Sequence, residues 1–171
     1  MQEHTHKKLK HKVKNIFEKW VVYYSLIENK PFFKPEQFSW TQELEKNWEI
    51  ICQELDKILS IQNVPTAQTI LPTSGIKKLS AQWKIYALYG YGIKVEKNCQ
   101  KCPKTTQLIE KIPGMKTAFF SILPPGTHLE EHRGPYNGVI RCLLGLKIPE
   151  QNFSHFRSTD IWMSGSNSHE I

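Results

Sequence analysis

The chain has 171 residues, about the size of one domain, and 39% of them are apolar or aromatic, which is enough for a hydrophobic core. Its net charge of +7 suits an anionic ligand or surface without establishing nucleic-acid binding. No apolar run reaches the roughly 18 to 20 residues of a membrane-spanning helix, and no cleavage signal follows the first residues. These features exclude a disordered chain and predict a soluble, cytoplasmic protein without a membrane span.

Two helices are predicted in the N-terminal part. A basic stretch, 7–14, leads into apolar residues spaced three and four apart, which predicts a helix with one side packed on the core. Its Lys and His neighbours are interpreted as a solvated face, in preference to a nucleic-acid or lipid-binding arm. Prolines end this helix, and Ser39 followed by Gln42 predicts a capping box for a second helix. The apolar positions of that second helix are Leu44, Trp48, Ile51, Leu55 and Leu59.

Strand signals begin in the middle of the chain. The stretch 83–95 is rich in aromatic and β-branched residues, which favour strands. A short helix is predicted at 106–112, followed by a strand at 116–123 that ends in a Pro-Pro-Gly turn. The last predicted strand, 139–148, alternates so that one of its faces is fully apolar.

The tail after Glu150 has a different character. It contains several Ser and Asn residues and a single apolar cluster, 161–163, so almost no regular structure is predicted there. The chain is therefore divided into an N-terminal helical region, 1–62, a β domain, 63–149, and an atypical tail, 150–171. Helices followed by strands correspond to the α+β class.

The densest group of reactive side chains lies at 125–141. If this stretch were a helix, His128 and His132 would imitate the pair of a zinc protease, but Pro and Gly leave only about seven residues for it, which is too short. As a strand, it places His128, Glu130 and His132 on one face. A metal role for these side chains and an ordinary surface role both remain open at this point.

Cys99 and Cys102 form a single C-x-x-C motif. The motif could form half of a zinc site or a redox-active pair, but no second C-x-x-C motif follows in the sequence. A loop dithiol without a metal is therefore the preferred interpretation, and reduced thiols are expected.

The stretch from Ser121 to Pro149, SILPPGTHLEEHRGPYNGVIRCLLGLKIP, resembles the aspartyl/asparaginyl β-hydroxylase family. The family pattern is close to S-x-x-x-P-G-T-H-x-x-x-H-x-G-P-x-N-x-x-x-R-x-H-L-G-L-x-I-P. Upstream, LYGYG at 88–92, LIEKIPG at 108–114 and the Trp-containing stretch 33–51 resemble the same family. The resemblance covers about Phe33 to Glu150.

This resemblance implies an Fe(II)- and 2-oxoglutarate-dependent dioxygenase that hydroxylates an unactivated C–H bond of a peptide side chain or an acyl chain. It implies N-terminal helices packed on a double-stranded β-helix, the jelly-roll or cupin-like fold. His132 matches the first iron ligand of the family, and His-Arg-Gly at this point matches its replacement of the usual Asp by Gly. Ser121 and Arg141 match the groups that bind 2-oxoglutarate, and Tyr89 matches an aromatic residue facing the pocket.

Two departures from the family pattern are visible. Leu143 replaces a histidine that also contacts 2-oxoglutarate, and the segment with the second iron ligand does not follow Pro149. His169, in a faint echo of the family's H-E-V, is the candidate second ligand.

The sequence is therefore interpreted as a C-terminally truncated or frameshifted member of the family, whose jelly-roll is incomplete. The alternative is a catalytically inactive remnant or binding module that lacks the second iron ligand. A basic nucleic-acid binder is disfavoured, because the lysines are not accompanied by an aromatic platform for RNA. The substrate, a protein or a lipid, is left open.

Overall fold

The structure is a computed structural model. It describes residues 30–61, 63–70, 82–127 and 139–148, the backbone of 161–164, and scattered positions between Val13 and Glu28. The chain divides into two compact units, and each is described by itself. The first consists of 1–34, 131–143 and 162–171, and the second of 35–130 and 144–161. Helices and antiparallel strands give an α+β fold, while the division at residues 62 and 149 stays a prediction.

The second unit contains a three-stranded antiparallel sheet in the order β3-β2-β4. Its strands are β2 (Lys84–Gly90), β3 (Ile93–Lys94) and β4 (Ala118–Ile122), so the strand predictions for 83–95 and 116–123 are confirmed. Tyr91 and Gly92 form the two-residue turn of the β2-β3 hairpin, with φ of 51° and 85°. Positive φ at both positions is the type I′ geometry, whose twist matches that of the strands.

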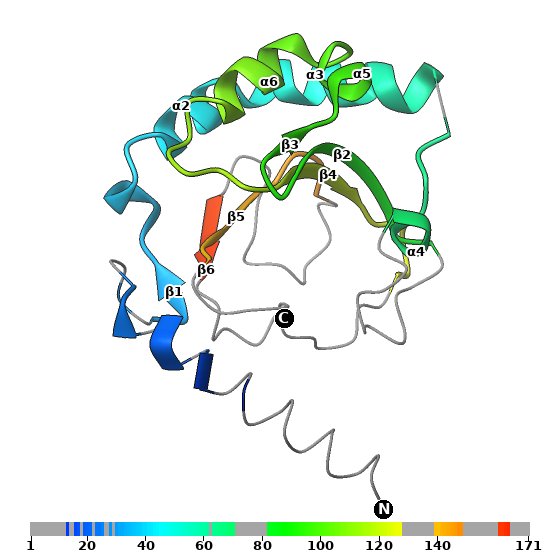
Figure 1. Ribbon diagram of the computed structural model, residues 1–171. Helices are drawn as coiled ribbons and strands as arrows, with labels where there is room; N and C mark the ends of the chain where they lie inside the picture. Colours follow the sequence, from blue (N-terminus) through cyan, green and yellow to red (C-terminus); the bar gives the residue numbers. More distant parts are fainter. Residues whose placement is uncertain are drawn as a thin grey trace, which may run out of the picture. The chain divides into compact units, whose positions relative to one another are not determined.

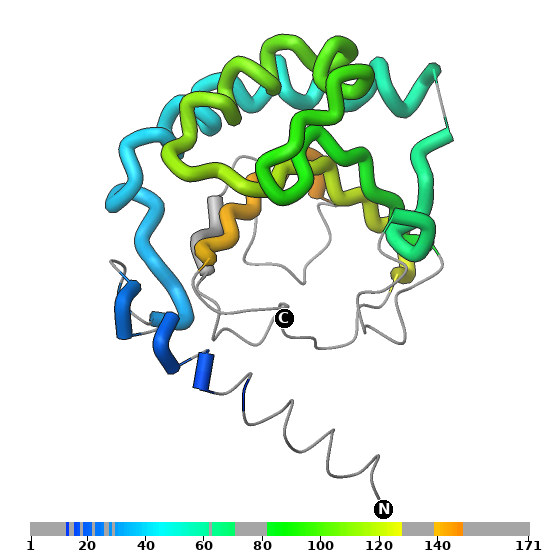
Figure 2. Tube along the Cα trace, viewed as in Figure 1, coloured from blue at the N-terminus to red at the C-terminus, as the bar shows by residue number. Residues whose placement is uncertain are grey.

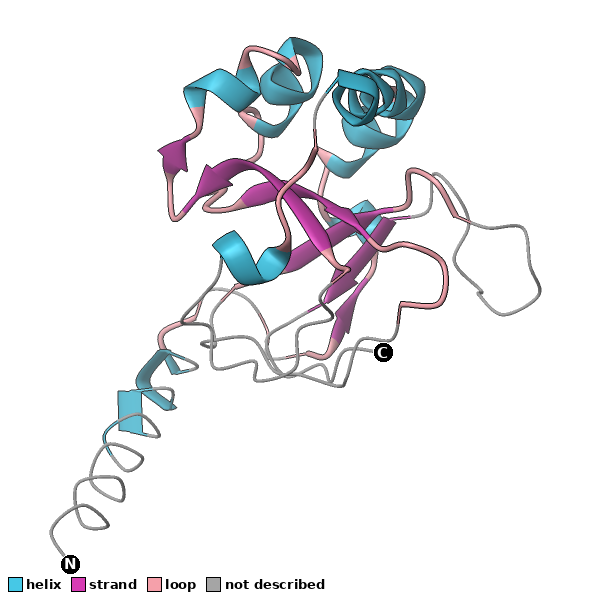
Figure 3. Ribbon diagram, turned by 90° about the vertical axis from the view of Figure 1, so that its right-hand side faces the viewer, coloured by secondary structure: helices cyan, strands magenta, loops and turns pink. Residues whose placement is uncertain are grey.

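Helices cover one face of this sheet (Figures 1 and 3). They are α2 (Thr41–Lys46), α3 (Trp48–Ile61), α5 (Glu96–Cys99) and α6 (Pro103–Ile109). Figure 2 shows the trace passing from β2 through α5 and α6 before it returns to the sheet as β4. The buried apolar side chains of these elements include Leu44, Ile51, Leu55, Ile58, Tyr86, Leu88, Leu108, Ile109 and Phe120.

The helix predicted after Ser39 consists of two helices. Asn47 separates α2 from α3, and its side-chain amide donates a hydrogen bond to the Glu43 carbonyl, a local bond that competes with helix continuation. The predicted capping box is wrong, because α2 has no side-chain cap. Thr41 instead donates its hydroxyl to the carbonyls of Pro35 and Phe38, at 3.0 and 2.7 Å, which ties α2 to the short 3-10 helix η1 (Pro35–Gln37).

A second sheet has the order β1-β6-β5. Its strands are β1 (Phe32–Phe33), β5 (Arg141–Leu144) and β6 (Ile161–Ser164), and Phe32 pairs with Ser164. The prediction of almost no strand after Glu150 is wrong for β6, because a four-residue strand is too short to show alternation in the sequence. The strand predicted over 139–148 is also shorter than expected, since β5 ends before Gly145.

The N-terminal segment departs from its prediction as well. Its described residues from Val13 to Tyr23 are helical, as expected. Their apolar side chains, however, are exposed, so the predicted packing of this helix on the core is wrong for Val13, Ile16, Phe17 and Trp20. Within the described part of the chain, no helix has the length and apolarity needed to span a membrane.

Candidate functional site

Ser121 lies on the sheet face opposite to the helices. In β4 the buried Phe120 faces the helices, and its neighbours Phe119 and Ser121 are exposed on the other face, as strand alternation requires. The Trp83 indole N–H donates a 2.9 Å hydrogen bond to Ser121 Oγ. Because an indole is only a donor, Ser121 Oγ acts as the acceptor in this contact. The hydroxyl proton of Ser121 can therefore be donated to a further acceptor.

The Trp83 side chain is held by a small cluster at one end of the sheet. It is buried together with Ile85 of β2 and Ala67 of α4 (Ala67–Ile70), and Ile70 packs against them. The Ala67 N–H donates to the Trp83 carbonyl at 2.7 Å, and the Ile85 N–H donates to the Pro65 carbonyl at 3.0 Å. These contacts fix the direction of the indole N–H, and with it the acceptor role of Ser121.

Arg141 is the first residue of β5, in the first unit. It is partly buried, and this burial lowers the pKa of its guanidinium from its ordinary value. Arginine nevertheless keeps its charge in proteins, and its planar fork suits a carboxylate. Leu143 lies two residues further along the same strand face and is 53% exposed. Leu143, which stands where the family pattern has a histidine, is thus an exposed apolar residue on the same strand face as Arg141.

One face of α3 holds the three residues that follow β5. Trp48, Cys52 and Asp56 are spaced four apart on this helix. The Trp48 indole donates to the Gly145 carbonyl at 2.9 Å, the Cys52 thiol donates to the Leu146 carbonyl at 3.3 Å, and Asp56 forms an ion pair with Lys147. Burial raises the pKa of Cys52, which keeps the thiol protonated as a donor. The helix therefore fixes residues 145–147 within the second unit.

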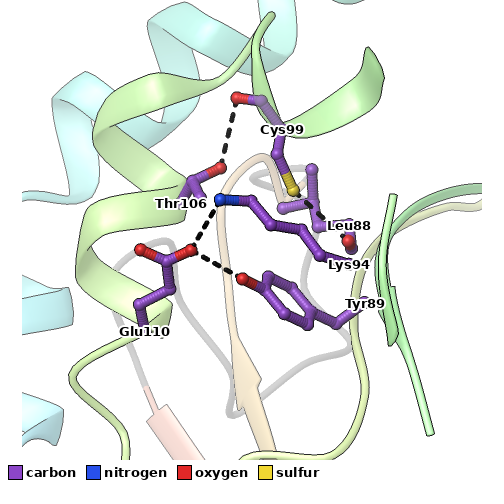
Figure 4. A network of polar contacts seen from close by, with 6 residues as sticks. All are labelled: Leu88, Tyr89, Lys94, Cys99, Thr106 and Glu110. Carbon is purple, nitrogen blue, oxygen red and sulfur yellow. Dashed lines mark hydrogen bonds and ion pairs between the residues drawn. The ribbon is translucent and has the colours of Figure 1, made fainter. Parts of the chain in front are cut away.

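A β-bulge determines where Tyr89 points. Ala87 pairs with Phe119, but Tyr89 pairs with Ala118, so Leu88 is an extra residue in β2. Regular alternation would place Tyr89 on the face of Ser121, whereas the bulge places it on the face of Phe120. Its hydroxyl donates a 2.6 Å hydrogen bond to Glu110 (Figure 4). The structure therefore does not bring Tyr89 and Ser121 together on one face, and a pocket role for Tyr89 stays a prediction.

Glu110 connects the β2-β3 hairpin to the end of α6. One of its carboxylate oxygens accepts the Tyr89 hydroxyl and the Lys94 ammonium, the latter at 2.9 Å (Figure 4). The Tyr89 hydrogen bond, followed by that of Lys94, holds the pKa of Glu110 below its ordinary 4.5, and the same contacts raise the pKa of Tyr89 and of Lys94. The network is exposed to solvent, so its contribution to stability is modest.

Glu110→Gln is expected to make the free energy of unfolding less dependent on pH. A carboxyl group whose pKa is lowered by folding stabilises the protein above its unfolded pKa, and this stabilisation is lost as pH falls through the lowered folded pKa. The difference between wild type and variant should therefore be largest near neutral pH and shrink below 4.5. Urea unfolding over a pH series measures it, with Glu45→Gln, an exposed carboxylate on α2, as control. A difference that does not vary with pH would contradict the prediction.

The C-x-x-C thiols are packing groups in the structure. Cys99 and Cys102 are both buried, and the Cys99 thiol donates to the Leu88 carbonyl at 3.3 Å (Figure 4). Burial, with the nearby charge of Glu54, raises the pKa of Cys102 to about 12. Reactive and metal-binding cysteines act as thiolates, which such a pKa disfavours. Both thiols are buried in this structure, and the interpretation as a loop dithiol without a metal stays a prediction.

Glu54 is a residue that sequence reasoning missed. It lies on the apolar face of α3 and is only 6% exposed. Its carboxylate accepts the backbone N–H of Lys104 at 3.0 Å and that of Thr105 at 2.8 Å, as well as the Thr105 hydroxyl at 2.7 Å. It thus caps the N-terminus of α6 from another helix. A carboxylate between Ile51, Leu55 and Ile58 on one helix face was the available signal.

The expected iron ligands, His132 and His169, lie outside the described residues, as does His128. Within the described ranges, no group of three His, Cys, Asp or Glu side chains could hold a metal ion. The ligand roles of both histidines stay predictions.

Comparisons with known proteins bear on this site. The family model described as "Aspartyl/Asparaginyl beta-hydroxylase" matches residues 45–167, a range that extends beyond Glu150. The "Ornithine lipid ester-linked acyl 2-hydroxylase" of Rhizobium tropici is 45% identical over 132 residues, which are 75% of this chain and 46% of that protein.

Two human proteins are also similar. The "Aspartyl/asparaginyl beta-hydroxylase" is 31% identical over 137 residues, which are 73% of this chain and 17% of that protein. The "Aspartate beta-hydroxylase domain-containing protein 2" is 35% identical over 115 residues, 62% of this chain and 30% of that protein. The chain thus matches less than half the length of each of these curated relatives.

Proposed function

The chain belongs to the aspartyl/asparaginyl β-hydroxylase family, and on this premise we propose that it is an Fe(II)- and 2-oxoglutarate-dependent dioxygenase. The proposal includes a double-stranded β-helix as the fold that carries the site. When bound, the iron and 2-oxoglutarate supply the chemistry: O2 places one oxygen atom in the substrate C–H bond and one in succinate, and CO2 is released. The residues of the chain bind and orient these groups.

The hydrogen bond from the Trp83 indole to Ser121 Oγ is the observation that carries the proposal, because it supports a role of Ser121 in binding 2-oxoglutarate. A carboxylate accepts hydrogen bonds but donates none, so its binding groups must supply protons. Ser121 Oγ accepts the hydrogen bond from the Trp83 indole, so the Ser121 hydroxyl proton remains available for donation to the carboxylate. Arg141, charged and partly buried, supplies the complementary cation in its own unit. We propose Ser121 and Arg141 as residues that bind 2-oxoglutarate.

For the iron, we propose His132 and His169 as ligands. A metal centre of this class must keep positions open for the two oxygens of 2-oxoglutarate and for O2, so two imidazoles are sufficient protein ligands. The His-Arg-Gly sequence that begins at His132 supports its assignment, and His169 is the candidate for the second position.

As substrate class we propose the acyl chain of a lipid, with a peptide Asp or Asn side chain as the second candidate. The support is comparative, because identity to the lipid acyl hydroxylase is 45% over 75% of the chain, against 31% to the aspartyl/asparaginyl hydroxylase.

The proposal is tested by measuring succinate formation from 2-oxoglutarate with Fe(II), ascorbate and O2, in the presence of an acyl-lipid or an Asp-containing peptide. We expect formation that depends on iron, is stimulated more by the lipid, and is lost in His132→Ala. His169→Ala should also lose it, whereas the matched control His155→Ala should keep it. Turnover that survives His132→Ala, or no iron-dependent succinate at all, would overturn the proposal.

A further inference from the structure

An exposed apolar stripe runs along the N-terminal segment and is used by no part of the proposed site. We call it the amphipathic segment and define its apolar face by Val13, Ile16, Phe17, Trp20 and Tyr24. Their spacing of three and four places them on one side of a helix, and their described neighbours are helical. Phe17 is 63% exposed and Trp20 is 62% exposed, although such side chains are normally buried.

The aromatic members of this face are arranged along the helix. The ring centroids of Trp20 and Tyr24, one turn apart, lie 5.9 Å from each other. Those of Tyr23 and Tyr24 lie 5.1 Å apart in an edge-to-face arrangement. Trp and Tyr carry a large apolar ring with a polar group at its edge, which favours the boundary between a lipid bilayer and water. The composition of the stripe is thus typical of an interfacial helix.

Positive charge accompanies this stripe in the sequence. The first 19 residues hold six lysines and two acidic residues. The lysines are Lys7, Lys8, Lys10, Lys12, Lys14 and Lys19. Lys19, the described member, is exposed. Basic residues beside an apolar face attract the helix to anionic lipid headgroups, and each lysine near the surface contributes about fivefold in affinity.

The positive charges of the segment also argue against two other partners for the stripe, a second copy of the segment and a nucleic acid. If a second copy of the segment covered it, the lysine-rich flanks of both helices would lie side by side, and like charges would oppose the contact. A nucleic acid would satisfy the lysines but leave the apolar face in water. An anionic lipid surface satisfies both, because its headgroups meet the lysines and its acyl region receives the aromatic rings.

We propose that the amphipathic segment is an anchor that holds the protein on an anionic lipid surface, with the helix in the plane of the interface. The inference rests on the exposed stripe and its charge, and it holds whether or not the chain is a dioxygenase.

Co-flotation of the full chain with vesicles tests this anchor. The vesicles contain phosphatidylcholine alone or phosphatidylcholine mixed with phosphatidylglycerol. We expect binding to the mixed vesicles that weakens as salt rises, and much weaker binding to the neutral vesicles, because salt screens the attraction between headgroups and lysines. Equal binding to both kinds of vesicle, or no binding to either, would overturn the proposal.

Variants separate the two contributions. Phe17→Ser and Trp20→Ser should each lower the vesicle partition coefficient about tenfold or more. The triple change Lys10→Gln, Lys12→Gln, Lys14→Gln should lower it about a hundredfold. Ile61→Ser, at an exposed apolar residue at the end of α3 (74% exposed), is the control and should leave binding unchanged. Phe17, Trp20 and Ile61 are exposed, so circular dichroism of these variants should show retained folding.

Two results would contradict the assignment to lipid. One is vesicle binding that Ile61→Ser weakens as much as Trp20→Ser does. The other is a self-association of the wild type on a sizing column that Trp20→Ser abolishes while vesicle binding stays the same, which would identify a second copy as the occupant. The assay needs neither iron nor 2-oxoglutarate, so its outcome is independent of the outcome of the succinate test.

Discussion

Glu54→Ala is expected to lower the free energy of unfolding by about 3 kcal/mol, a large part of the roughly 5 to 15 kcal/mol of a typical domain. The change removes the acceptor for the backbone N–H groups of Lys104 and Thr105 and for the Thr105 hydroxyl. A buried donor that has lost its acceptor destabilises the folded state by its full desolvation free energy. The lost side chain also leaves a small cavity between α3 and α6. The negative charge at the N-terminus of α6 is lost as well.

Urea unfolding of the full chain, followed by circular dichroism, measures this effect. Glu54→Gln keeps the shape and one acceptor oxygen, so it should cost about half as much as Glu54→Ala. Glu49→Ala, an exposed position on the same helix, controls for the general effect of removing a carboxylate from α3 and should change stability by less than about 0.5 kcal/mol. If Glu54→Ala were no more destabilising than Glu49→Ala, the capping role would be refuted.

Ser121→Ala is expected to raise the dissociation constant for 2-oxoglutarate by about 10- to 100-fold, since a hydrogen bond to a charged group contributes about 1.5 to 3 kcal/mol. Trp83→Phe should raise it less, because it leaves the hydroxyl in place and only removes the indole donor that makes Ser121 Oγ an acceptor. Anaerobic isothermal titration of the iron-loaded protein with 2-oxoglutarate gives both values.

The matched control for this experiment is Ser60→Ala, an exposed serine on α3 whose hydroxyl bonds only within its own helix turn, to the Lys57 carbonyl. It should bind 2-oxoglutarate as the wild type does. Unfolding curves of Ser121→Ala and Trp83→Phe show whether each variant is folded at the temperature of titration. A Ser121→Ala protein that is folded and binds with unchanged affinity would remove Ser121 from the site.

Features that depend on local chemistry were predictable from the sequence. The strands around Tyr86 and Phe120 were recognised from β-branched and aromatic residues, and both are buried on the helix-covered face. The Pro-Pro-Gly turn is present as expected, with φ of 76° at Gly126 and a 3.1 Å hydrogen bond from the Thr127 N–H to the Pro124 carbonyl.

Features that depend on distant partners were not predictable. The direction of Tyr89 is set by an extra residue, Leu88, and no periodicity in the sequence reveals a bulge. Glu54 was missed because its partners lie about 50 residues further along the chain, on another helix. The strand β6 was missed because its pairing with β1 and β5, and no pattern within its four residues, makes it a strand. For the candidate site, Ser121 and Arg141 could be proposed from the family pattern alone, whereas the Trp83 contact required the structure.

The pairing of β1 with β6 has a consequence for the order in which the chain folds. Phe32 and Phe33 meet their partners near the opposite end of the chain, so this pairing closes a long loop and carries a high entropic cost. The sheet β3-β2-β4 and the helices α2, α3, α5 and α6 need only residues between 41 and 122. During synthesis on the ribosome, that part can form its contacts first, and the β1-β6-β5 sheet can close only after Ser164 has emerged.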